Sequence, residues 1–74
     1  GNCGWNAGSG WYGCDGVPGL EDPDGITPIA CPGNPKEGDP CQEGGPISGV
    51  GCCMPNGDNF YCAGLEIILE SCGG

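Results

Sequence analysis

Residues 51–72, GCCMPNGDNFYCAGLEIILESC, carry the strongest structural signals of the chain. Residues 55–59 (PNGDN) are rich in the residues that form tight turns, and they separate the cysteine pair at 52–53 from the aromatic segment at 60–62. This arrangement predicts two short strands joined by a turn. A run of aliphatic residues at 65–70 follows after Ala63 and Gly64.

Two structures compete for residues 65–70. Leu65, Ile68, Leu69 and Cys72 have the spacing of an apolar stripe on a helix. The short length of the run, its β-branched residues and the turn before it favour a strand instead. We therefore predict a strand that ends at Cys72.

The cysteine content indicates how a chain this short is stabilised. Seventy-four residues with 18 glycines bury too little apolar surface to fold on that basis alone. The eight cysteines are an even number and suggest four disulfides, which form in oxidising compartments. Zinc is the alternative, but the chain has no histidine and no C-x-x-C pair. We therefore predict that every cysteine is oxidised: Cys3, Cys14, Cys31, Cys41, Cys52, Cys53, Cys62 and Cys72.

Charge restricts the classes of partner. Ten carboxylates stand against one basic residue, Lys36, and the net charge is −9. Nucleic-acid binding and adsorption to anionic membranes both require clustered Lys and Arg, so neither is expected. The longest apolar run is too short to cross a bilayer, and no signal peptide is visible. We expect a mature, secreted, extracellular protein whose partner is a protein or a polysaccharide.

The first half of the chain has weaker signals. Residues 1–14 are expected to form a glycine-rich loop, and residues 15–40, rich in Pro and Gly, to form turns and loops with one short extended piece at 29–31. The fold class that follows is small and disulfide-rich. It is a single β-rich domain over residues 1–74, with short antiparallel strands, long Gly/Pro loops and four disulfides.

The cysteine order C-C-CC-C-C from Cys31 to Cys72 resembles that of knottin toxins and inhibitors. This resemblance implies a protease inhibitor or toxin as an alternative function. It also implies pairing of Cys31 with Cys53, Cys41 with Cys62, and Cys52 with Cys72. Eight cysteines allow 105 pairings, so the order does not fix the connectivity.

Residues 38–72 contain Gly38-Asp39-Pro40-Cys41, the turn at 55–59 with the aromatic residues and Cys62 after it, and a final strand and cysteine. In these features the segment resembles small cysteine-rich secreted fungal proteins of the effector type, including chitin-binding modules attached to fungal chitinases. Leu65 stands where such modules often have tryptophan. The resemblance implies a secreted fungal protein, effector-like, with a sugar as one possible ligand.

Catalysis is not expected, and neither is a cofactor. The chain lacks histidine, the usual general base, and its serines have no visible activator. Acidic turns at 21–24 and 58–59 offer oxygen ligands that would suit calcium. Such turns are more often simply solvated, so we assign no metal site.

Aromatic side chains are the candidate ligand-binding residues: Trp5, Trp11, Tyr12 and Tyr61. Trp5 and Trp11 would form an exposed platform, held rigid by a bridge between Cys3 and Cys14. The opposing interpretation is that the few aromatic residues form the core, which we favour for Phe60 or Tyr61. The function we expect is extracellular binding of a host protein or a cell-wall polysaccharide, without enzymatic activity.

Overall fold

A β-hairpin, and not the loop expected for residues 1–14, begins the fold. The computed structural model of the chain describes residues 2–72, and in it β1 (Gly4–Asn6) pairs antiparallel with β2 (Trp11–Gly13). The carboxamide oxygen of Asn6 accepts hydrogen bonds from the N–H groups of Gly8 (3.0 Å) and Ser9 (3.2 Å), and this closes the turn. Gly10 completes the turn with a φ of +81°, which glycine adopts without strain. The prediction of a loop was wrong because these glycines form the turn of a hairpin, between two strands.

A third, short strand completes this sheet. β3 (Val17–Pro18) lies on the other side of β1, so the strand order is β2-β1-β3. The return of the chain to β1 requires glycine at two positions. A Cβ at Gly4 would overlap the carbonyl of Val17, and a Cβ at Gly16 would overlap the carbonyl of Gly4.

The second sheet comes from residues 52–70. It has the order β4-β5-β6, with β4 at Cys52–Cys53, β5 at Asn59–Ala63 and β6 at Glu66–Glu70, all antiparallel. The predicted turn at residues 55–59 connects β4 to β5, and the backbone N–H of Met54 donates to the carbonyl of Asp58 (2.8 Å). The strand predicted from residue 65 onward is confirmed as β6, but it begins at Glu66 and ends at Glu70, two residues before the expected end at Cys72. The small, β-rich, disulfide-rich fold class is confirmed as well.

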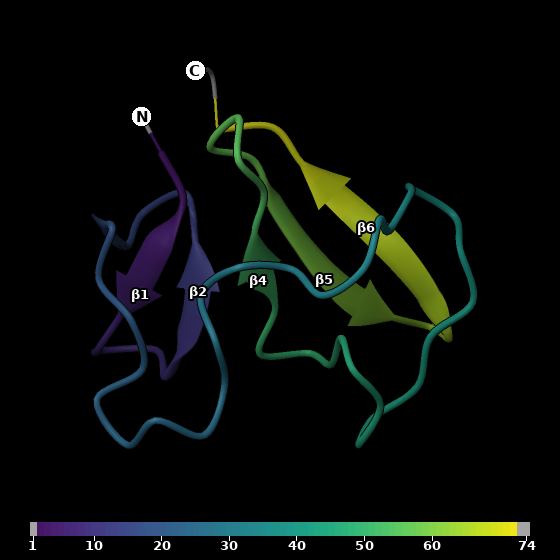
Figure 1. Cartoon of the computed structure of the whole chain (residues 1–74), viewed down its shortest axis with the longest axis horizontal. Helices are drawn as coiled ribbons and strands as arrows, with labels where there is room; N and C mark the ends of the chain where they lie inside the picture. Colours follow the sequence, from purple (N-terminus) through teal and green to yellow (C-terminus); the bar gives the residue numbers. More distant parts are fainter. Residues whose placement is uncertain (1, 73–74) are drawn as a thin grey trace.

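Figure 1 shows the two sheets side by side, with β2 of the first next to β4 of the second. The N–H of Tyr12 donates to the carbonyl of Val50 (2.9 Å) across this junction. One apolar cluster lies at the junction: Cys3, Trp5, Tyr12, Cys53 and Cys72. A second cluster lies on the other side of the second sheet: Ile47, Cys52, Phe60 and Ile67.

The long loop between the sheets follows the second sheet closely. Ala30 forms a parallel bridge with Cys53, and this is the short extended piece predicted at residues 29–31. Pro40 forms an antiparallel bridge with Glu66 farther along. None of the elements in residues 2–72 is a helix, and so none could cross a membrane as one.

All eight cysteines form disulfides, as predicted, and the zinc alternative therefore fails. Two bridges join the two sheets, Cys3–Cys53 and Cys14–Cys72. Two others fasten the long loop to the second sheet, Cys31–Cys52 and Cys41–Cys62. Of the pairings implied by the knottin resemblance, only Cys41–Cys62 is present. The other two are wrong because Cys53 and Cys72 bond to cysteines of the first sheet, which the knottin pattern lacks.

Candidate functional site

A groove of about 570 Å³ lies where the first sheet meets the second, and it brings together three of the four candidate aromatic residues. Strand β2 and the segment after it form one side, and β5 and β6 of the second sheet, with Gly49, form the other. We call this the aromatic groove, and it is lined by Trp11, Tyr12, Cys14, Asp15, Gly49, Asn59, Tyr61 and Glu70.

Trp11 is the exposed aromatic side chain of the groove. Its residue is 51% exposed, although indole is among the largest apolar groups a protein can bury. The residue after next, Gly13, has no side chain between the indole and the carboxylate of Asp15. A Cβ built there would lie 3.9 Å from Trp11 Cδ1 and 3.0 Å from Asp15 Oδ1, so the ring and the carboxylate flank the same glycine.

Tyr61 contributes the second accessible ring. It lies on β5, is partly buried, and pairs with Ile68 of β6. Its neighbour Phe60 faces the other side of the strand and is buried in the core, which confirms the expectation that Phe60 or Tyr61 would be a core residue.

Trp5 and Tyr12 are core residues. They stand opposite each other on β1 and β2, and their rings meet edge to face with centroids 5.0 Å apart. Trp5 is 9% exposed and Tyr12 is 1% exposed. The expected platform of two exposed tryptophans is therefore absent, and so is the bridge between Cys3 and Cys14 that would have held it. Alternation along the hairpin turns Trp5 inward and Trp11 outward.

The hydroxyl of Tyr12 reaches past the core to hold the loop at residues 20–27. It donates to the carbonyl of Thr27 (2.6 Å) and accepts from the N–H of Asp22 (2.9 Å). Burial raises the pKa of this hydroxyl above its ordinary value, and the nearby carboxylates of Asp22 and Glu21 add to the effect, while the hydrogen bond from Asp22 opposes it. Tyr12 therefore lines the groove and also holds the loop at residues 20–27 in place through its hydroxyl.

Asp22 is the central residue of the acidic turn considered for calcium, and its carboxylate is already hydrogen-bonded to backbone N–H groups. It accepts hydrogen bonds from the N–H groups of Asp24 (2.9 Å), Ile26 (3.1 Å) and Thr27 (3.1 Å). At the other acidic turn, Asp58 accepts from the N–H of Cys72 (3.1 Å). Within residues 2–72 no three His, Cys, Asp or Glu side chains are grouped as a metal site requires.

Two carboxylates line the aromatic groove, and sequence reasoning missed both. Asp15 Oδ2 accepts a hydrogen bond from Asn6 Nδ2 (2.9 Å), and Glu70 Oε1 accepts one from Asn59 Nδ2 (3.2 Å). Each carboxylate is thus positioned by an amide from a neighbouring strand. The two residues are far apart in the chain, and the Cys14–Cys72 bridge, one residue from Asp15 and two from Glu70, links the segments that carry them. No local sequence signal connects them.

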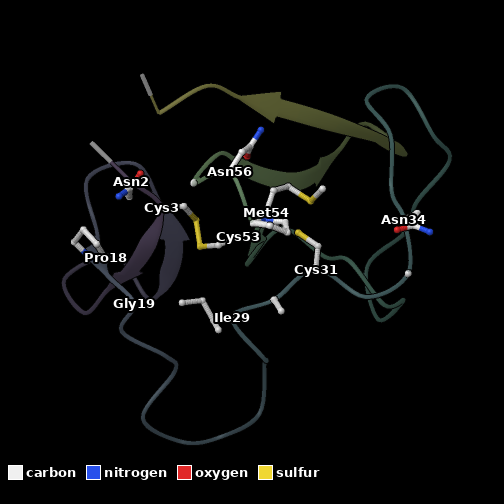
Figure 2. Close-up of a pocket in the computed structure, with 14 residues that line it drawn as sticks. Asn2, Cys3, Pro18, Gly19, Ile29, Cys31, Asn34, Cys53, Met54 and Asn56 are labelled. Atoms are coloured by element: carbon white, nitrogen blue, oxygen red, sulfur yellow. A yellow bond between two sulfur atoms is a disulfide. The ribbon is translucent and has the colours of Figure 1, made fainter. Parts of the chain in front are cut away.

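A second depression, of about 480 Å³, lies over the Cys3–Cys53 disulfide. Figure 2 shows this bridge at its centre, with Asn2 and Pro18 on one side, Met54 on the other, and Asn34 well apart. Its lining combines aliphatic and proline side chains with amide and sulfur groups, and no charged side chain takes part. None of the candidate aromatic residues lines it, so it is the weaker candidate.

The aromatic groove combines aromatic side chains with positioned hydrogen-bond acceptors at a water-accessible surface. Such a surface can bind planar or hydroxyl-bearing groups by stacking and hydrogen bonding. Comparisons of the chain with protein-family models, with curated proteins and with solved structures found no match.

Proposed function

We propose that this protein acts outside the cell as a non-enzymatic binding protein, and that its ligand, an extracellular protein or a cell-wall polysaccharide, occupies the aromatic groove. The half-exposed Trp11 is the observation that carries the proposal. The chain has only five Trp, Tyr and Phe residues with which to build a core. It nevertheless leaves this tryptophan half exposed, in a groove that Tyr61 and two hydrogen-bonded carboxylates also line.

Secretion is supported by the four disulfides, which persist in oxidising compartments. The resemblance of residues 38–72 to small secreted fungal proteins supports an effector-like role. The alternative of a knottin-type inhibitor or toxin has less support, since two of the three pairings it implies do not occur.

Trp11 provides a reporter for testing the proposal. Trp5→Phe keeps an aromatic ring in the core and leaves Trp11 as the single tryptophan. We expect its fluorescence to change saturably with at least one member of a panel of chitin and cellulose oligosaccharides and short peptides of varied charge. Calorimetry with Trp11→Ala in the otherwise unchanged chain should then show loss of that binding.

The control variant is Ile26→Ala, because Ile26 is 79% exposed but lies outside the groove. It should bind as the unchanged chain does, and both variants should keep nearly the same melting temperature. Equal binding by Trp11→Ala and the unchanged chain would exclude the aromatic groove. Failure of the whole panel to bind would also count against the proposal.

A further inference from the structure

We infer that the group received by the aromatic groove is an arginine side chain of a protein partner. The inference rests on the proposed function and specifies the chemistry of its ligand. It is carried by the combination of exposed rings and positioned carboxylates, and by the charge of the whole chain.

The rings favour a planar cation. The face of an indole is negative, and a guanidinium stacks on it through both electrostatic attraction and flat contact. Trp11 lines the groove and is 51% exposed, and Tyr61 lines the opposite side from β5. A lysine ammonium would gain the electrostatic attraction but not the flat contact.

The carboxylates supply the matching anions. The hydrogen bond from Asn6 engages Asp15 Oδ2, and Oδ1 of the same carboxylate lies beside Gly13, the glycine that the indole of Trp11 also flanks. The hydrogen bond from Asn59, which is only 3% exposed, fixes Glu70 on the opposite side of the groove. Guanidinium has five N–H donors in one plane and can reach more than one acceptor at once.

No cation of the chain neutralises this groove from its own lining. The single basic side chain, Lys36, is exposed on the long loop between the sheets and does not line the groove. A neutral ligand would remove water from Asp15 and Glu70 without supplying a counter-charge, which is unfavourable. A cation supplies that counter-charge, and the net charge of −9 also attracts basic partners over longer distances.

The test uses the Trp5→Phe chain and three blocked tripeptides, in which glycine flanks a central arginine, lysine or citrulline. Citrulline keeps the planar shape of the arginine head group without its charge. We expect the arginine peptide to quench Trp11 saturably and to bind about tenfold more tightly than the citrulline peptide. The lysine peptide should fall between them, and 0.5 M salt should weaken both cationic peptides.

Variants of the two carboxylates locate the effect. Asp15→Asn and Glu70→Gln preserve side-chain shape and should each weaken the arginine peptide about tenfold. Glu37→Gln makes the same change in net charge at an exposed residue outside the groove, and it should leave the affinity nearly unchanged.

Three results would overturn the inference. Equal affinity for the arginine and citrulline peptides would exclude recognition of charge. If Glu37→Gln weakened binding of the arginine peptide as much as Asp15→Asn and Glu70→Gln do, the attraction would be a non-specific effect of net charge. Stronger binding of a neutral chitin or cellulose oligosaccharide at Trp11 would assign the groove to a sugar. In that last case the proposed function would stand and only the arginine ligand would fail.

Discussion

Asp22 shows how one residue can organise a loop that has no regular secondary structure. Its carboxylate caps three backbone N–H groups, and its own N–H is capped by the Tyr12 hydroxyl. Hydrogen bonds from Asp24, Thr27 and Ile26 lower the pKa of the Asp22 carboxyl below its ordinary value, and partial desolvation opposes this only in part. The ionised form is therefore the one that holds the loop.

This pKa shift predicts a dependence of stability on pH. An acid whose pKa is lowered on folding adds stability above its unfolded pKa, about 4, and loses that contribution as the pH falls through the folded value. We expect acid to lower the melting temperature of Asp22→Asn less than that of the unchanged chain between pH 5 and pH 2.5. Thermal denaturation followed by circular dichroism would measure the difference.

Asp24→Asn is the matched control for this prediction. It removes the same charge two residues away, and Asp24 engages the turn through its backbone N–H, which the substitution keeps. Its response to acid should resemble that of the unchanged chain. An acid response of Asp22→Asn that equals the response of Asp24→Asn would contradict the role given to the Asp22 carboxylate.

Among the elements, the hairpin of β5 and β6 contains one residue that does not suit its position. Ala63 pairs with Glu66, so Gly64 and Leu65 form a two-residue turn, with φ values of +63° and +69°. A turn of this kind requires two left-handed residues and favours Asn-Gly. Leu65 is 70% exposed and has a Cβ that disfavours this conformation, so it gains little burial to offset the strain.

Leu65→Gly should therefore stabilise the protein. Relief of the left-handed conformation outweighs the entropy that glycine loses on folding, and we expect a net gain of about 0.5–1 kcal/mol in the free energy of unfolding. Chemical denaturation with the disulfides intact would measure it. Leu20→Gly is the contrasting change, at an exposed leucine without a positive φ, and it should not stabilise. If Leu65→Gly lowered the free energy of unfolding, the contacts of the leucine side chain would contribute more stability than the strained backbone costs.

Elements in the second half of the chain were predictable because their signals are local. The turn at residues 55–59 and the β-branched run in β6 each depend on a few adjacent residues, and both predictions are confirmed. The hairpin of β1 and β2 was missed because glycine-rich sequence is usually typical of loops. Its register depends on the pairing of Trp5 with Tyr12 and on the turn at Asn6. Both are contacts of the folded chain that no local sequence pattern indicates.

The candidate site was predictable in its aromatic residues but not in its charges. Trp11, Tyr12 and Tyr61 meet at one groove because β2 lies against the second sheet. Which of the two nearby tryptophans faces outward depends on strand register. The sequence alone therefore does not show that Trp5 is buried and Trp11 exposed. Asp15 and Glu70 approach each other through a disulfide whose pairing no sequence pattern specifies.

At the scale of the whole molecule, the disulfides substitute for a large core. The two bridges between the sheets close long segments, with sequence separations of 50 and 58 residues, and the two that hold the long loop each span 21. In the chain-entropy model a closed loop of about 20 to 60 residues contributes about 3–4 kcal/mol. The inter-sheet bridges also determine where the two sides of the aromatic groove lie.

Removal of the Cys14–Cys72 bridge should therefore affect the groove beyond its effect on stability. Cys14 lines the groove, and its bond to Cys72 holds Asp15 near Glu70. We expect the double variant Cys14→Ala/Cys72→Ala to lose about 2–4 kcal/mol of stability. We also expect Trp11 to become more accessible to acrylamide under conditions where circular dichroism shows that the chain remains folded.

The double variant Cys41→Ala/Cys62→Ala separates these two effects. It removes a bridge that fastens the long loop, and Cys62 points to the opposite face of β5 from Tyr61. Its loss of stability should be similar, because a shorter loop costs only slightly less entropy to close. Acrylamide quenching of Trp11, measured in the Trp5→Phe background, should then remain that of the intact protein. Equal quenching in the two double variants would mean that packing of the sheets, and not the Cys14–Cys72 bridge, sets the geometry of the groove.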